Sequence, residues 1–352
     1  MEKAIIAMSG GVDSSVCGCL TIKQGYECIG ATLKLYDKET QVGDTRRQLD
    51  DINDAKSVAE KLGIPHYVFN YRDEFKEKVI IPFINSYKKG ETPNPCIECN
   101  KYLKFSKLLA KADELGIKYI ATGHYAIVEK RSDGRFVLKK AIDLSKDQSY
   151  VLYNLTQEQL SRVIFPLGTL TKTEARQIAE ENGFVNAHKS DSQDICFIPD
   201  GKYAEFIENY TKEKFSNGDF VDKNGKVLGE HKGIIRYTIG QRKGLGLALP
   251  HPMYVLKKDM KNNRVILCDN DDLFTADLDA RNVNLIAIDE INEPIRVKAK
   301  VRYKQTEQWA TVSNNNDGTY HVKFDEPQRA IASGQAVVFY DGDIVVGGGT
   351  II

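Results

Sequence analysis

The sequence contains no apolar run close to the roughly 20 residues that a membrane-spanning helix needs. It has no excess of charge of either sign, because 49 basic residues balance 49 acidic ones. Seven cysteines in a chain of this size do not make a disulfide scaffold, and an odd number cannot pair completely. Residues 1–8 are too short to predict a secretory signal peptide. We therefore expect a cytoplasmic protein with no membrane partner, in which only motifs can indicate nucleic-acid binding.

The 352 residues exceed what one ordinary hydrophobic core needs, and they predict two or three domains. Residues 1–199 alternate short apolar strands with helices, which predicts right-handed crossovers and a doubly wound parallel sheet. Residues 200–276 include a stretch rich in glycine and lysine, and we expect a small central linker domain there. In residues 277–352, short strands separated by Asn-Asp-Gly, Glu-Pro and Asp-Gly turns predict an antiparallel β-barrel.

The segment Ser9–Ser15 reads Ser-Gly-Gly-Val-Asp-Ser-Ser and lies between the first predicted strand and the first predicted helix. Its glycines let the backbone approach an anion closely, and a helix N-terminus presents unpaired amides and a partial positive charge. The lysine of the common G-x-x-x-x-G-K-[ST] phosphate loop is missing. The alternative is a simple glycine turn in which Asp13 or Ser14 caps the helix. Two glycines with an aspartate and two serines favour an anion site.

The same segment resembles the pyrophosphatase-type loop of N-type ATP hydrolases, which cleave ATP between the first two phosphates and adenylate a substrate. This resemblance implies ATP and Mg²⁺ as ligands, with Asp13 helping to place the metal ion. It assigns the pyrophosphate to the remaining residues of the loop: Ser9, Gly10, Gly11, Val12, Ser14 and Ser15.

Two cysteine-bearing segments carry the other candidate chemistry. Cys96 and Cys99 lie in Thr92–Asn100, where a proline-rich loop leads into a predicted helix over residues 100–115. The helix dipole favours the thiolate of a cysteine at such a start, so we expect a lowered pKa for Cys99. Cys196 lies in the second segment, between polar residues and an apolar pair. The remaining four cysteines are interpreted as small core residues: Cys17, Cys19, Cys28 and Cys268.

The C-x-x-C spacing of Cys96 and Cys99 is compatible with three kinds of chemistry. A structural zinc site needs four ligands, and the sequence offers no second C-x-x-C and no paired histidines. A thioredoxin-like redox pair lacks its usual fold context. A reactive pair that serves sulfur transfer fits best beside an ATP loop.

Seven motifs follow one another along the chain. They are residues 9–15, 92–100, 121–125, 146–150, 191–197, 237–246 and 324–329. In sequence and in order they resemble the motifs of the bacterial tRNA-specific 2-thiouridylases of the PP-loop ATPase superfamily, and the resemblance spans essentially the whole chain.

This resemblance implies that the wobble uridine of tRNA is adenylated by ATP and then attacked by a cysteine persulfide. Cys99 would be the nucleophile and Cys196 the persulfide carrier, and the two would form a transient disulfide during turnover. A ring carbonyl oxygen leaves poorly, whereas its AMP ester leaves well, and a persulfide is a soft, strong nucleophile. A sulfur-donor protein that carries a persulfide is the implied partner.

The resemblance also implies two sets of contacts. ATP would be lined by the stretch Ala7, Met8, Ser9, Gly10, Gly11, Val12, Asp13 and Ser14, together with Leu33 and Gly123. The central domain would contact tRNA, as would Asn94, Pro95, Cys96, His124, Lys146, Asp147, Gln148, Arg302, Tyr303, Lys304 and Gln335. Taken without the resemblance, the polar residues from position 124 onward read as ordinary loop and surface side chains.

The resemblance is incomplete at Cys96, where many relatives carry an aspartate. Cys96, Cys99 and Cys196 could instead hold an iron–sulfur cluster with an open iron, which would then carry the sulfur. Two other functions stay open. One is a different adenylating enzyme of the superfamily, such as an amidotransferase-coupled synthetase or an argininosuccinate-type ligase. The other is an inactive tRNA-binding or sulfur-carrier module.

Overall fold

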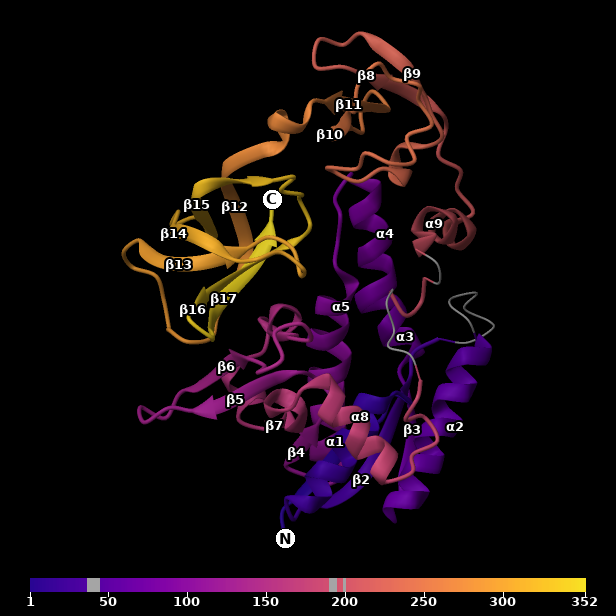
Figure 1. Ribbon diagram of the computed structural model, residues 1–352, viewed down its shortest axis with the longest axis vertical. Coiled ribbons are helices and arrows are strands. Elements are labelled where there is room, and N and C mark those ends of the chain that lie inside the picture. Colours follow the sequence, from indigo (N-terminus) through magenta and orange to yellow (C-terminus); the bar gives the residue numbers. More distant parts are fainter. Residues whose placement is uncertain (37–44, 190–194, 199–200) are drawn as a thin grey trace.

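The computed structural model describes residues 1–36, 45–189, 195–198 and 201–352 (Figure 1). Its first sheet is parallel and has the strand order β3-β2-β1-β4-β7. The strands are β1 (Lys3–Ala7), β2 (Glu27–Lys34), β3 (His66–Asn70), β4 (Tyr119–Ala121) and β7 (Val163–Ile164). The strand order changes direction between β1 and β4, as in a doubly wound sheet. The predicted parallel sheet is confirmed.

Both faces of this sheet are covered, because the residues of β1 after the exposed Lys3 point alternately to opposite sides and are all apolar. Ile5 packs into one core cluster, and Ala4 and Ile6 pack into another. On the Ala4–Ile6 side lie α1 (Val12–Lys23), α2 (Thr45–Leu62) and α8 (Lys172–Glu181). On the Ile5 side lies α6 (Leu108–Glu114), which continues a helical run that begins at α5 (Pro95–Glu98). A π-helical segment, Cys99–Lys107, joins α5 to α6.

A second sheet forms the central part of the chain. Its strands are β8 (Gly218–Val221), β9 (Val227–His231), β10 (Tyr254–Asp259) and β11 (Arg264–Cys268), in the order β10-β11-β8-β9. It packs with α9 (Tyr203–Thr211) against α3 (Arg72–Phe75) and α4 (Ile81–Lys88) in one apolar cluster. The central sheet is therefore fixed to the helices that lead toward the cysteine segment (Figure 1).

The C-terminal part is the predicted antiparallel barrel. It consists of β12 (Phe274–Leu285), β13 (Ile295–Lys300), β14 (Gln308–Asn314), β15 (Thr319–Arg329), β16 (Ala336–Asp341) and β17 (Ile344–Ile351). The barrel closes because β12 pairs with both β15 and β17. The barrel sheet also continues into a hairpin, β5 (Ala126–Lys130) and β6 (Phe136–Lys140), through the pairing of β17 with β6. The alternation of strands and helices in the sequence did not predict this hairpin.

No helix among the described residues combines the length and the apolar character needed to cross a bilayer.

Lys258 is an unusual buried residue at the contact between the central sheet and α4. Its side chain is 8% exposed, and its Nζ has no hydrogen-bond partner. The ammonium lies 5.8 Å from the centroid of the Tyr87 ring. Burial lowers the pKa of Lys258 from 10.5 to about 8.

The burial of Lys258 predicts that the free energy of unfolding rises with pH. Between pH 8 and 10.5 the unfolded chain binds more protons at Lys258 than the folded chain does. The free energy of unfolding should therefore increase by up to about 1.4 kcal/mol per pH unit in this range. Lys258→Met should remove this dependence and stabilise the protein at neutral pH. Thermal unfolding at both ends of the range tests this, with Lys257→Met on the exposed face of the same strand as control. Equal pH slopes in the two variants would contradict it.

Candidate active site

The anion loop Ser9–Ser15 lies at the carboxyl end of β1, next to the point where the strand order changes direction between β1 and β4. Open α/β sheets bind their ligands in the crevice at such a point. Leu33, near the end of β2, and Gly123, just after β4, lie at the same edge of the sheet. The structure thus brings the predicted ATP residues to one edge.

Two later residues hold the loop in place. The Asn186 side chain, 3% exposed, donates to the Gly10 carbonyl oxygen (2.9 Å) and to Ser15 Oγ (3.0 Å). Lys189 Nζ donates to the same carbonyl (3.3 Å) and forms ion pairs with Asp51 (2.7 Å) and Asp54 (2.6 Å). Neither residue lies in a motif that the sequence analysis singled out. Their role follows only from the fold, because they are far from the loop along the chain.

Gly10 cannot be replaced without moving backbone. Its φ is +75°, and a Cβ there would lie 2.2 Å from the carbonyl oxygen of Asp51. Gly123 is also closely packed, since a Cβ at this position would lie 2.7 Å from the carbonyl carbon of Asp13. These two glycines allow α2 and the loop after β4 to contact the anion loop directly.

Asp13, the predicted magnesium ligand, is held by two side chains. Its Oδ1 accepts from the Tyr125 hydroxyl (2.9 Å) and forms an ion pair with Lys172 Nζ (2.7 Å). Lys172 is the first residue of α8, and its side chain is only 12% exposed. A cation therefore lies beside the anion loop although the loop motif itself lacks a lysine. A carboxylate suits Mg²⁺ and a lysine suits phosphate oxygens, so the pair fits a metal–phosphate ligand.

The cysteine helix begins at Pro95, five residues before the predicted start. Asn94 is its N-cap, and its side chain accepts a hydrogen bond from the Cys96 amide (3.2 Å). Cys96 and Cys99 are three residues apart and so lie on neighbouring positions of one helix face. Cys99 is buried, whereas Cys96 and Cys196 are exposed as whole residues although their thiols are poorly hydrated.

The three thiols lie close enough to influence one another. The pKa of Cys196 is raised to about 12, mainly by loss of hydration and then by the neighbouring Cys99 and Cys96. Burial raises the pKa of Cys99 to about 11. The pKa of Cys96 is raised by the same cause. Lys104, one turn along the helical run, opposes these shifts at all three thiols. Sequence reasoning missed Lys104.

The prediction that the helix start lowers the pKa of Cys99 is wrong for the protein without substrates. Cys99 lies a full turn after the N-terminus of α5, so it receives less of the helix dipole than Cys96. It is also 8% exposed, and burial disfavours the thiolate more than the dipole and Lys104 favour it. The thiol of the free protein is therefore protonated at neutral pH.

Phe197 anchors the chain next to Cys196. Its fully buried ring makes edge contacts with Phe75 (5.4 Å), Phe83 (5.6 Å) and Phe206 (5.5 Å). The Tyr36 hydroxyl also donates to the Cys196 carbonyl oxygen (3.3 Å). Residues 191–194 of the cysteine motif lie outside the described residues. In the anchored part, residues 195–198, Cys196 lies close enough to Cys99 for the charge of one thiolate to act on the other.

The residues predicted to contact tRNA fall into two groups, of which the first gathers near Cys96. Tyr303 is 36% exposed, and its ring lies 6.0 Å from that of Tyr150. Burial raises the pKa of Tyr303 to about 12, and the charges of Asp147 and Cys96 contribute. Gln335 Nε2 donates to the Thr92 carbonyl oxygen (2.7 Å), which ties the barrel to the loop before Asn94. Lys146 and Gln148 flank the buried Asp147.

The second group consists of His124, Arg302 and Lys304, and its first two members are less accessible to a ligand than the third. His124 is buried, packs near Phe105 and Phe165, and pairs through Nδ1 with the Thr122 hydroxyl (2.7 Å). Burial lowers the pKa of His124 well below its usual value. The Arg302 guanidinium donates to the Ile239 (3.1 Å) and Ala330 (2.9 Å) carbonyl oxygens. Lys304 is exposed. Contact of these residues with tRNA stays a prediction.

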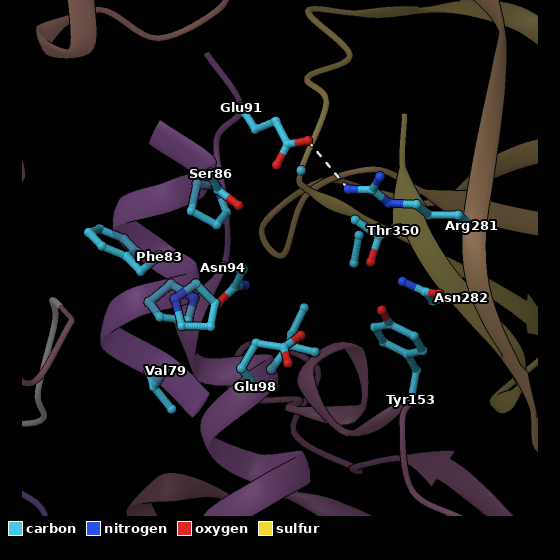
Figure 2. A pocket seen from close by; sticks show the side chains of 16 residues that line it. Val79, Phe83, Ser86, Glu91, Asn94, Glu98, Tyr153, Arg281, Asn282 and Thr350 are labelled. Carbon is cyan, nitrogen blue, oxygen red and sulfur yellow. Dashed lines mark hydrogen bonds and ion pairs between the residues drawn. The ribbon is translucent and has the colours of Figure 1, made fainter. Parts of the chain in front are cut away.

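A cavity of about 170 Å³ lies between α4, α5 and the barrel (Figure 2). Asn94, Glu98, Tyr153 and Thr350 line it, and an ion pair between Glu91 and Arg281 (3.3 Å) crosses from the first domain to β12. None of the three thiol-bearing residues lines this cavity. The cavity therefore marks the contact between the first domain and the barrel.

Within the described residues, no three His, Cys, Asp or Glu side chains are grouped closely enough to hold a metal ion. Cys96, Cys99 and Cys196 all belong to this part of the chain, and a cluster held by these three cysteines stays a hypothesis.

Comparison with known proteins shows three family models that match consecutive parts of the chain. The tRNA methyl transferase HUP domain matches residues 2–200, and the tRNA methyl transferase PRC-barrel domain matches residues 204–269. The Aminomethyltransferase beta-barrel domain matches residues 275–351.

Curated relatives match over nearly their full length. The tRNA-specific 2-thiouridylase MnmA of Acetivibrio thermocellus is 50% identical over 355 residues, which cover 99% of both chains. The protein of the same name from Clostridioides difficile is 50% identical over 353 residues, covering 99% of this chain and 98% of that protein. Among solved structures, a 4-thiouridine synthetase–RNA complex with bound ATP is 18% identical, with a TM-score of 0.37. It covers 60% of this chain and 50% of that one, and this likeness is too slight to support an argument.

Two glycines with positive φ provide a matched test of the anion loop. Gly10→Ala should abolish ATP binding, because its Cβ would collide with Asp51 and displace the loop. Gly25→Ala, also at positive φ (+90°) but with nothing within 4 Å, should lose about 1–2 kcal/mol of stability and keep its ATP affinity. Calorimetric titration with ATP and thermal unfolding of both variants measure this. Unchanged ATP affinity in Gly10→Ala would show that the ligand binds elsewhere.

Proposed function

Because the chain belongs to the tRNA-specific 2-thiouridylase family, we propose that it replaces the 2-carbonyl oxygen of the wobble uridine of tRNA with sulfur. One observation carries the proposal. Asn186 and Lys189 hold the anion loop, and Cys196, seven residues further along the chain, lies beside Cys99. The site for ATP and the site for sulfur are thus built by neighbouring parts of one segment.

The first step is adenylation. The uridine 2-oxygen attacks the α-phosphorus of ATP, the bond from that phosphorus to the bridging oxygen breaks, and pyrophosphate leaves. The loop Ser9–Ser15 and Lys172 bind the leaving group, and Asp13 helps to place the Mg²⁺ that accompanies ATP. Asp13 and Lys172 neutralise each other before ATP binds, so the loop carries no uncompensated charge when empty.

The second step is sulfur transfer. The outer sulfur of a persulfide on Cys196 attacks the uracil carbon, and AMP leaves with the former carbonyl oxygen. The Cys99 thiolate then attacks the inner sulfur of Cys196, so that the S–S bond to the transferred sulfur breaks and a Cys99–Cys196 disulfide forms. An external thiol reduces this disulfide, and a persulfide-bearing donor protein reloads Cys196. Lys104 is the cation that favours the Cys99 thiolate.

Cys96 distinguishes this persulfide relay from a cluster mechanism. Cys99→Ser and Cys196→Ser should both lose thiolation, whereas Cys96→Asp should stay active, because many relatives carry aspartate there. Cys268→Ala, a buried cysteine outside the site, is the control. The measurement is mass analysis of tRNA nucleosides after incubation with ATP, Mg²⁺ and a persulfide donor, beside iron and sulfide analysis of anaerobically purified protein.

Activity of iron-free protein would rule out the cluster. Activity that appears only after iron and sulfide are restored, with Cys96→Ser as inactive as the other two serine variants, would contradict the relay. If no variant and no parent protein forms 2-thiouridine, but AMP is released with another acceptor, the chain is a different adenylating enzyme.

A further inference from the structure

The chain has a single tryptophan, and it is exposed on the barrel. Trp309 lies near the start of β14 and is 49% exposed. The Arg296 guanidinium lies 5.2 Å from the centroid of its ring, and Lys298 Nζ lies 5.5 Å from it. We refer to Arg296, Lys298 and Trp309 as the β13–β14 patch. Nothing in the proposed chemistry of the thiols or of ATP uses these residues.

The strand register places the whole patch on the outer face of the barrel. Lys298 pairs directly with Trp309, and Arg296 pairs with Thr311. The residues between them, Val297 and Ala310, are buried in the barrel core. Since side chains alternate along a strand, the patch points outward. Its surroundings are polar: Thr311 lies in the next outward position of β14, and Lys323 is exposed opposite it on β15.

Arg296 is held in place by an ion pair, whereas the charge of Lys298 is available to bind an anion. Asp325 on β15 binds both terminal nitrogens of Arg296, which holds the guanidinium against the tryptophan ring. Lys298 is half-buried and forms no ion pair with another described residue. After the Arg296–Asp325 pair is counted as neutral, the patch keeps one positive charge beside an aromatic ring.

A row of cations and aromatic rings connects the patch with the cysteine site. Lys298 pairs with Tyr340 on β16. Lys300, the next outward residue of β13, lies 5.2 Å from the Tyr340 ring centroid and 5.6 Å from that of Tyr150. Tyr150 in turn contacts Tyr303, whose pKa responds to Cys96. Lys300, Tyr340 and Tyr150 are buried where the barrel meets the first domain. The patch and Tyr303 therefore lie on either side of this buried contact.

We propose that the β13–β14 patch is a second contact for tRNA, outside the target nucleotide. Trp309 stacks on an unpaired base or a ribose, Lys298 contacts an adjacent phosphate, and Arg296, held by Asp325, supports the tryptophan ring. This inference rests on the proposed function, because RNA is the partner only if the chain modifies tRNA. Exposed aromatic rings beside cations are the usual platform for single-stranded nucleic acid. A protein partner would instead need a larger apolar surface than one ring among polar neighbours.

The single tryptophan makes this inference directly measurable. Excitation at the red edge of the absorption band selects Trp309 over the 17 tyrosines. Adding tRNA should quench the emission with the same concentration dependence as binding measured by filter retention. Free N-acetyltryptophanamide corrects for absorption by the RNA. If tRNA binds by filter retention while the emission stays unchanged, Trp309 is not in contact with the RNA and the proposal is overturned.

Variants of the patch residues distinguish tRNA binding by the patch from catalysis at the active site. Trp309→Ala should weaken tRNA binding by about 5- to 100-fold, and it should raise KM for tRNA with kcat unchanged. Trp309→Phe should keep most of the affinity. Lys298→Ala should lower the slope of log affinity against log salt by about 0.7 to 0.9. Lys56→Ala is the matched control, since Lys56 is an exposed lysine on α2, across the first domain from the barrel (Figure 1).

Three other outcomes would each contradict either the patch proposal or the proposed function. Unchanged affinity, KM and salt slope in both patch variants would overturn the proposal while leaving thiolation by the parent protein untouched. A loss of sulfur transfer from the donor protein with unchanged tRNA affinity would also overturn it, because the patch would then bind a protein. Failure of the parent to bind tRNA at all would instead contradict the proposed function.

Discussion

The carbonyl oxygen of Gly10 accepts hydrogen bonds from both Asn186 and Lys189, and the arrangement of the active site depends on this contact. Lys189 also binds Asp51 and Asp54 on α2, so one lysine joins the anion loop, α2 and the segment that leads to Cys196. The close approach of Gly10 to Asp51 makes the contact possible, because any side chain there would separate the two backbones. Apolar packing fixes the chain next to Cys196, since the Phe197 ring packs among three phenylalanines.

The raised pKa values of the thiols fit a site that is inactive without its substrates. Three neighbouring thiols in a poorly hydrated place cannot all ionise, because each thiolate would lack solvent and would repel the others. Protonated thiols react slowly with oxidants, so the raised pKa values protect Cys99 and Cys196 from oxidation in the free protein. Under the proposed function, the Cys99 thiolate forms in the complex with tRNA and ATP, and Lys104 is the cation that favours it.

The sequence predicted the features that depend on local pattern. The strand before Ser9, the glycine loop and the order of parallel sheet and barrel all follow from short apolar runs and turn residues. Features that depend on distant contacts were missed. Asn186, Lys189 and Lys172 approach the loop from more than 150 residues away, and no local pattern marks them. The hairpin β5–β6 has a local turn signal, Asp133-Gly134, that the sequence analysis overlooked. That it joins the barrel sheet through β17, about 200 residues later, has no local signal. The pKa of Cys99 was predicted in the wrong direction, since a helix start is visible in the sequence and burial is not.

The central claim is that ATP activates the carbonyl oxygen of the uridine by adenylation before sulfur arrives. The most direct test uses tRNA whose wobble uridine carries heavy oxygen at the 2-carbonyl, incubated with the protein, ATP, Mg²⁺ and a persulfide donor. The account predicts that each 2-thiouridine formed is matched by one AMP that contains the heavy oxygen and by one unlabelled pyrophosphate. Heavy oxygen in water or in inorganic phosphate, or thiolation accompanied by ADP, would contradict it.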